Sequence, residues 1–340
     1  MPKVSVIVPN YNHANFLALR LESILKQTFE DFELIFLDDG STDDSLEVFS
    51  QFANDSRIIS VFSQDNSGNP FIQWNKGIDL ARGEFVWIAE SDDFSDTEFL
   101  QAMVEKLEGN PEVGLACCQS WVVSDQGEKL YKIEGFPELG NSTRWLGDYL
   151  NSGRDEILRF LALQNTIPNA SAVLFRKSLL AGDLRAPEHL KLCGDWWFWI
   201  RVLAMSDIAF LAAPLNYFRQ AHSASQRGSI STLGTEVTEA LEIQGLVLSQ
   251  VNPDRKSKRH MLKHHLRNWV SKAIHFGMKR QWNGQVLNGF LNIYRLNVTC
   301  GLYERVLIYM YYLLVIPIKQ NRLYRKFIAP GELRRFERKQ

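Results

Sequence analysis

The sequence predicts an α/β protein with a mainly parallel central sheet, joined to a helical C-terminal region. Short apolar runs alternate with helix-like segments over residues 1–120, and from about Gly234 the pattern is helical throughout. Apolar residues make up 45% of the 340-residue chain and charged residues 23%, as in ordinary globular proteins. Strands that alternate with helices imply a parallel sheet with helices on both faces.

The individual elements follow from periodicity and capping signals. Apolar residues recur at helical spacing between Phe16 and Leu25, and Ser41 or Thr42 stands where it would cap the next helix, which runs through Phe52. Further helices are expected at 72–81, 96–107 and 196–205, and strands at 4–9, 33–37, 57–62, 85–89, 113–118, 171–176, 209–212 and 217–219. We place a domain boundary between residues 1–232 and a basic, helical region at 233–340.

Acidic residues follow two of the expected strands. Asp38 and Asp39 come at the end of the second strand, and Glu90, Asp92 and Asp93 follow the fourth. In such sheets ligands bind beyond the carboxyl ends of the strands, so we expect both acidic groups to face one crevice. Carboxylates this close repel one another unless a cation lies between them. The pattern indicates a metal site; the alternative is a polar turn before a helix N-terminus, where acids are tolerated.

Four segments resemble those of family 2 glycosyltransferases in order and spacing. They are VSVIVPNYN (4–12), LDDGSTDDS (37–45), GEFVWIAESDD (83–93) and GDWWFWIR (194–201). Each alone is weak, but together they are specific, and the resemblance covers roughly residues 3–225. It implies the GT-A nucleotide-diphospho-sugar transferase fold for residues 1–232. It also implies an enzyme that moves a sugar from a nucleoside diphosphate to an acceptor hydroxyl with inversion.

The resemblance assigns the acids after the fourth strand to a metal and diphosphate site. The family's DxD motif falls on residues 90–92, where Asp92 aligns with the acid that contacts the metal and Asp93 with a common third acid. Glu90 departs from the usual Asp, and we expect it on the nucleotide side, reaching the ribose or the metal. A YRxHxxS-like element adds His222 to the same site. The implied cofactor is Mn²⁺ or Mg²⁺, which neutralises the diphosphate as a Lewis acid.

On the nucleotide side, the resemblance places Pro9 and Tyr11 beside the base and makes Asp39 an acceptor from the pyrimidine ring. A carboxylate accepts well from an imide N–H, which fits uracil, so we expect a UDP-linked donor. Asn75 lies in a segment that resembles the loop and helix beside the nucleotide. The family often has Arg where Trp74 stands, and we expect this Trp to be a packed core aromatic.

Asp195 is the expected catalytic base, because an inverting transfer needs a carboxylate that takes the proton of the acceptor hydroxyl. In the family this Asp opens a helix, and many relatives have a second acid where Gly194 stands. The aromatic run 196–199 follows directly. At helical spacing such residues usually belong to the core, so we expect at most one of these rings to stack on a sugar.

The C-terminal region is basic, with 19 Lys and Arg against 5 Asp and Glu in residues 241–340. Its apolar run at 306–318 is too short to span a bilayer as a helix and is followed by further cations. One interpretation is docking on an anionic membrane leaflet, where the enzyme meets a lipid-linked acceptor. The other is a helix that packs on the catalytic domain or forms a dimer. Nucleic-acid binding is a third interpretation, but no known motif supports it.

The cysteines and the N-terminal segment suggest a location. Four cysteines without CxxC spacing indicate a reducing compartment, and the first residues do not have the pattern of a signal peptide. We expect a cytoplasmic protein, peripheral on the inner face of the membrane if the tail docks there, that acts in cell-surface polysaccharide or glycolipid assembly on a glycan or lipid-linked acceptor. Two other classes stay open: a non-catalytic sugar-nucleotide-binding protein, and a nucleotidylyltransferase, although the latter would need a Gly-rich phosphate loop.

Overall fold

The computed structural model describes residues 1–133, 135, 139, 143–167, 169–219, 230–275, 285–289 and 293. The chain divides into two compact units, Met1–Ser223 and Ala224–Gln340, and each is described by itself. Two predictions, His222 as a site residue and the apolar run at 306–318, lie outside the described residues.

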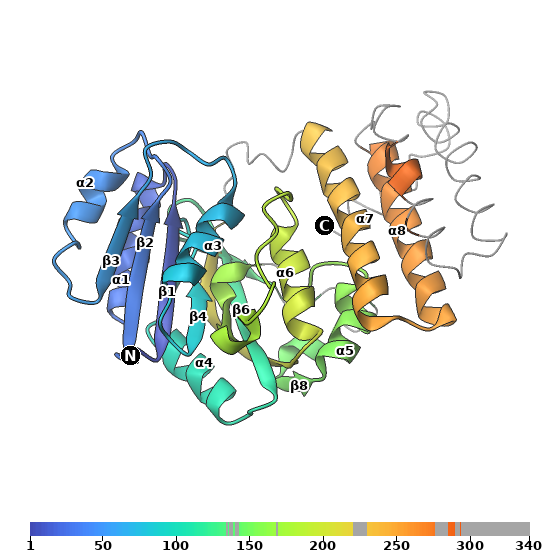
Figure 1. Ribbon diagram of the computed structural model, residues 1–340, viewed down its shortest axis with the longest axis horizontal. Coiled ribbons are helices and arrows are strands. Elements are labelled where there is room, and N and C mark those ends of the chain that lie inside the picture. The colour runs from blue at the N-terminus through green and yellow to red at the C-terminus, as the bar shows by residue number, and fades with distance from the viewer. Residues whose placement is uncertain are drawn as a thin grey trace. The chain divides into compact units, whose positions relative to one another are not determined.

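A ten-stranded sheet forms the centre of the first unit (Figure 1), with the main order β3-β2-β1-β4-β9-β6-β10-β5, while β7 pairs with β6 and β8 with β10. The strands are β1 Val4–Asn10, β2 Phe32–Asp38, β3 Ile58–Phe62, β4 Phe85–Ile88, β5 Phe94–Ser95, β6 Val113–Val123, β7 Lys129–Lys132, β8 Tyr149–Asn151, β9 Val173–Arg176 and β10 Asp207–Arg219. The first four in spatial order are parallel. Then β9 lies antiparallel between β4 and β6, and β6 is parallel to β10. The predicted α/β class is confirmed.

Helices cover both faces of this sheet. One face packs against α1 Ala14–Leu25, α2 Ser45–Ser50 and α4 Phe99–Glu108, which share a buried apolar cluster with alternate residues of β1 and β4. The other face carries α3 Pro70–Leu80 and α6 Gly194–Leu203. There Gly77 of α3 packs so tightly that a Cβ would lie 2.3 Å from Cγ2 of Ile7. Burial of both faces explains why the central strands β1, β2 and β4 are mostly apolar rather than alternating.

Some local predictions were wrong. Neither Ser41 nor Thr42 caps α2, because the residue at its N-cap is Asp44, and the Ser41 hydroxyl instead donates to Asp38. The two short strands expected at 209–212 and 217–219 are one 13-residue strand, β10. Its register with β6 shifts on both sides of Pro214, because proline has no N–H to donate to the ladder. The pairing with β6 then resumes at Asn216, so the strand continues past the proline.

The second unit is helical in its described part, as predicted. It contains α7 Ile230–Val251 and α8 Arg255–His275. Buried apolar side chains from both helices include Leu241, Val247, Leu266 and Trp269. Within the described residues, no helix has the length and apolarity that a membrane span requires.

A short helix, α5 Gly153–Glu156, supports the C-terminal end of α6. The backbone N–H of Gly153 donates to Asp207 Oδ1 at 3.0 Å. A Cβ on this glycine would lie 2.0 Å from the carbonyl oxygens of both Leu203 and Ser206. The glycine therefore lets two backbone segments approach more closely than any side chain permits.

We predict that Gly153→Ala lowers the free energy of unfolding by about 3 kcal/mol, because the added methyl overpacks a site walled by backbone. Urea denaturation measures the loss. The matched control is Gly147→Ala, where a Cβ would meet nothing within 4 Å, and the expected change is within about 0.5 kcal/mol. Equal unfolding midpoints for the two variants would contradict the close approach.

Candidate active site

The two predicted acidic groups reach the same edge of the sheet. β1 lies between β2 and β4 and is parallel to both. The chain leaves β2 after Asp38, whose register partner in β1 is Asn10. It leaves β4 at Ala89, whose N–H donates to the Ile7 carbonyl at 2.8 Å. Both acidic segments therefore start from the carboxyl ends of strands that flank β1.

Asp38 and Asp39 are neighbours with different surroundings. Asp38 is buried and accepts hydrogen bonds from Asn10 Nδ2 at 2.9 Å, Ser41 N at 2.9 Å and Ser41 Oγ at 2.6 Å. It ties the end of β1 to the loop that follows β2. Asp39 accepts from the backbone N–H of Ser67 at 3.1 Å, from the Ser67 hydroxyl at 2.6 Å and from Gln73. These donors fix the orientation of the Asp39 carboxylate.

Helix α3 connects the two acidic groups through consecutive residues. Gln73 Nε2 donates to Asp39, and Trp74 Nε1 donates to Glu90 Oε1 at 2.9 Å. Trp74 is only 2% exposed and packs edge-on against Phe71 and Phe198. It is a packed core aromatic, as predicted, but its indole N–H also holds Glu90, which the sequence did not indicate.

The segment Glu90–Asp93, here called the acid loop, is held by side chains from distant parts of the chain. Arg219 at the end of β10 donates from Nε to the Asp92 carbonyl at 2.7 Å and from its backbone N–H to Asp93 Oδ1 at 2.9 Å. Asn169 Nδ2 donates to Asp93 Oδ2 at 3.0 Å. Within the described part of the chain, the Asp92 carboxylate makes no hydrogen bond. The acid loop thus has a fixed backbone and one open carboxylate.

Crowding of these acids perturbs their titration. Burial, and then the Asp92 charge, raise the pKa of Glu90 to about 8. Burial and the same neighbour raise the pKa of Asp93 to about 6, against the opposing charge of Arg20. Ionising all three acids at the same time therefore costs free energy at this edge of the sheet.

Sequence reasoning missed Arg20, which lies fully buried in α1. Its Nε donates to the Glu90 carbonyl at 3.0 Å. Burial lowers its pKa to about 10, although Asp93, Asp92 and Glu90 all act to raise it. A signal was present, because Arg20 falls on the apolar stripe of α1 with Leu17, Leu21 and Ile24, where a charged residue is unexpected. His13 was missed too; its Nδ1 lies 2.8 Å from Ser91 Oγ.

Asp195, the predicted base, lies in the first turn of α6. Asn165 Nδ2 donates to its Oδ2 at 3.0 Å. The preceding Gly194 packs against Phe71 of α3, where a Cβ would lie 2.3 Å from the ring. The Phe71 ring thus fills the space in which many relatives have a second acid, and it brings the start of α6 against α3.

The aromatic run of α6 belongs mainly to the core, as expected. Trp196 is 7% exposed, and Phe198 and Trp199 are completely buried. Only Trp197 is partly exposed, and the Arg201 guanidinium lies 5.0 Å from its ring.

The remaining predicted nucleotide contacts have contrasting positions. Pro9 is buried in β1, and Tyr11, the first residue after that strand, is 40% exposed. Asn75 uses both ends of its amide: Nδ2 donates to the Ala186 carbonyl at 3.0 Å and to Glu188 Oε1 at 2.8 Å, and Oδ1 accepts from Ala186 N at 2.9 Å. A nucleotide contact stays a prediction for all three residues.

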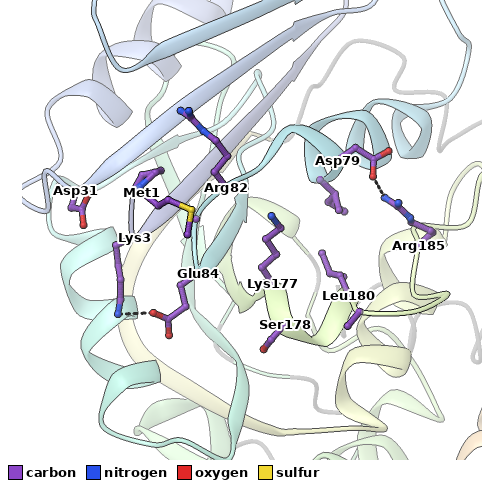
Figure 2. A pocket seen from close by; sticks show the side chains of 14 residues that line it. Met1, Lys3, Asp31, Asp79, Arg82, Glu84, Lys177, Ser178, Leu180 and Arg185 are labelled. Atoms are coloured by element: carbon purple, nitrogen blue, oxygen red, sulfur yellow. Dashed lines mark hydrogen bonds and ion pairs between the residues drawn. The ribbon is translucent and has the colours of Figure 1, made fainter.

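A pocket of about 710 Å³ lies elsewhere, beside the amino ends of β1 and β4. Figure 2 shows two ion pairs among its charged side chains, Lys3 with Glu84 and Arg185 with Asp79. Lys3 Nζ and Glu84 Oε2 are 2.7 Å apart. None of the predicted site residues that the structure describes lines it. The acidic residues therefore lie at the carboxyl ends of the strands, and this pocket lies at their amino ends.

The family model of Glycosyl transferase family 2 matches residues 5–181. The chain belongs to this family, and the predicted resemblance is confirmed; the match includes the first three motifs, while the fourth, at 194–201, lies beyond it. The glycosyltransferase GlyA of Streptococcus pneumoniae serotype 4 is 24% identical over 299 residues, which cover 76% of this chain and 43% of GlyA. The chain spans less than half the length of the curated relatives it matches.

The fold is shared with solved structures. TarS 1–349 of S. aureus, in complex with UDP-GlcNAc, gives a TM-score of 0.69 at 19% identity, covering 94% of this chain and 89% of that chain. The mannosyltransferase PcManGT of Pyrobaculum calidifontis, in complex with GDP-Man and Mn²⁺, gives 0.51 at 16% identity, covering 94% and 87%. The predicted GT-A fold class is confirmed.

We predict that Asn75→Ala lowers the free energy of unfolding by about 2–3 kcal/mol, because it leaves the N–H and the carbonyl of the buried Ala186 without these hydrogen bonds. Urea denaturation measures this, with the exposed neighbour Lys76→Ala as the control, expected within about 0.5 kcal/mol. A variant of unchanged stability that loses nucleotide affinity would show that Asn75 serves the ligand and not the fold.

Proposed function

We propose that the protein is an inverting glycosyltransferase that transfers a sugar from a UDP-linked donor to an acceptor hydroxyl with the help of a divalent cation. The observation that carries this proposal is the acid loop, where Asp92 offers an open carboxylate while its neighbours are held in place. Family membership supports the reaction class. The rest of the proposal concerns what each held side chain contributes.

The acid loop suits a cation that arrives with its substrate. Within the described residues, no three His, Cys, Asp or Glu side chains are arranged to hold a metal ion by themselves. Mg²⁺, however, is commonly held by one or two carboxylates together with substrate phosphates. Asp92, with Glu90 or Asp93 beside it, supplies such hard oxygen donors. A bound Mn²⁺ or Mg²⁺ would neutralise the diphosphate leaving group. The PcManGT complex, which contains GDP-Man and Mn²⁺, supports this choice of cation.

The nucleotide would lie along the end of β1. Tyr11 and Pro9 would line the base, and the Asp39 carboxylate, oriented by Ser67 and Gln73, would accept from the uracil imide N–H. A carboxylate has about four lone-pair sites, so these donors leave it capacity for a ligand. The UDP-GlcNAc bound to TarS supports the choice of uracil.

Asp195 would act as the general base. Its carboxylate takes the proton of the acceptor hydroxyl while that oxygen bonds to the anomeric carbon and the diphosphate leaves. The hydrogen bond from Asn165 Nδ2 to Asp195 Oδ2 fixes the orientation of the Asp195 carboxylate at the start of α6. No second acid helps at position 194, since Phe71 fills that space.

The acceptor and location are proposed from the C-terminal sequence. Its excess of cations and its apolar run favour a glycan or lipid-linked acceptor met by a cytoplasmic enzyme at the inner face of the membrane, in polysaccharide or glycolipid assembly. Nucleic acid is not among the proposed partners.

We predict that Asp92→Asn and Asp195→Asn each lower the rate of sugar transfer by about 10²–10⁴-fold, since one weakens the cation site and the other removes the base. Donor turnover with Mn²⁺ is measured against Asp79→Asn, a carboxylate at the remote pocket, which is expected to keep the wild-type rate. Full activity in both Asp92→Asn and Asp195→Asn would rule out this site.

We predict that Asp39→Asn lowers the preference for UDP over CDP by about tenfold, because a charge-assisted hydrogen bond to the imide is lost and cytosine lacks that N–H. Calorimetric titration of both nucleotides with Mn²⁺ measures the ratio. The exposed loop residue Asp65→Asn is the control. An unchanged ratio in Asp39→Asn would separate Asp39 from base recognition.

A further inference from the structure

Two arginines, Arg219 and Arg20, donate hydrogen bonds to backbone carbonyls of the acid loop. They differ in how many of their guanidinium nitrogens have a hydrogen-bond partner among the described residues. Arg219 donates from Nε to the Asp92 carbonyl, and its Nη1 donates to the Ser124 carbonyl at 2.7 Å. Arg20 makes the matching bond to the Glu90 carbonyl, but within the described residues its Nη1 and Nη2 are buried and have no hydrogen-bond partner. A guanidinium without exposure and with two unpaired nitrogens is costly in any apolar site.

The surroundings of Arg20 explain how that cost is offset. Its guanidinium carbon lies 5.0 Å from the Trp87 ring, which is a favourable contact for a cation. Three carboxylates, those of Asp93, Asp92 and Glu90, act on it as opposite charges. Because neither group has full access to water, each stabilises the other more than a surface pair would.

We infer that Arg20 is the internal counter-charge of the acid loop: a positioning residue that stabilises Glu90–Asp93 while no cation is bound and weakens the binding of a cation when one arrives. This inference rests on the proposed function, since it assumes that the loop binds a divalent cation. An arginine that served packing alone would neither couple to the charge of Asp92 nor oppose a metal.

A double-mutant cycle tests the charge directly and needs no metal. Asp92→Asn is a clean partner, because the Asp92 carboxylate has no hydrogen bond to lose within the described residues. Arg20→Gln is expected to lower the urea midpoint in the wild-type background. In the Asp92→Asn background the loss should be smaller, since one of the charges that face Arg20 is gone. Additive losses overturn the inference.

The control for the cycle is Arg144→Gln. This arginine is also largely buried, but it pairs with Glu156 rather than with the acid loop, so its loss should be the same in both backgrounds. If Arg20→Gln does not fold alone, the inference requires that Asp92→Asn restore folding. Failure to fold in both backgrounds contradicts it.

Titration with Mn²⁺ in the absence of nucleotide, followed by the EPR signal of free Mn²⁺, tests the second half. Arg20→Gln should bind Mn²⁺ roughly tenfold more tightly than the wild type, because a nearby positive charge is removed. Arg20→Lys keeps the charge and should stay within about twofold of the wild type. Unchanged or weaker binding in folded Arg20→Gln overturns the inference.

The two experiments separate this inference from the proposed function. If wild type and Asp92→Asn bind Mn²⁺ equally, the metal site of the proposed function is wrong. The cycle still decides whether Arg20 compensates the acids. If Asp92→Asn loses Mn²⁺ while the cycle is additive, the metal site stands and the role of Arg20 is wrong.

Discussion

The mutual repulsion of carboxylates at one edge of the sheet is the constraint on which the rest of the site depends. Parallel pairing of β2, β1 and β4 forces Asp39 and the acid loop to the same edge. A folded chain tolerates this only if donors and cations converge there. They come from three separate elements: Arg20 from α1, Trp74 from α3 and Arg219 from β10. The core around the edge is therefore built as much by electrostatics as by apolar packing.

Helix α3 contacts three parts of the site and fixes their positions relative to one another. Its first turn packs Phe71 against Gly194 and so sets the start of α6, which carries Asp195. Two residues later it holds Asp39 and then Glu90 through adjacent side chains. A single rigid helix thus relates the nucleotide side, the acid loop and the base. Rigid elements hold catalytic groups more accurately than loops do, and here the loops themselves are pinned to the helix.

The two edges of the sheet use charge in opposite ways. At the amino edge, two pairs of charged side chains around the pocket neutralise each other, Lys3 with Glu84 and Arg185 with Asp79. At the carboxyl edge, within the described residues, the Asp92 carboxylate makes no hydrogen bond, and two nitrogens of Arg20 have no hydrogen-bond partner. Paired surface charges contribute little beyond solvation and local order. Acids that are crowded and partly buried, with perturbed pKa values, are typical of functional sites. In this protein the arrangement of charged groups is therefore a better guide to the site than the volume of a cavity.

By itself, the sequence determined most of the strands and helices, the acids at the carboxyl ends and the family, because all three depend on short-range pattern: apolar periodicity, strand ends and motif spacing. It did not indicate the short strands β5, β7 and β8 or the short helix α5. Tertiary structure alone decided which partners those acids have. Arg20 and the Glu90 carbonyl are 70 residues apart, and Arg219 and the Asp92 carbonyl 127, a separation that no local pattern encodes. The continuity of β10 across Pro214, and the Phe71 ring in the space beside Gly194, are likewise packing outcomes. Periodicity tells which face of an element is buried, and only the assembled core tells what lies against it.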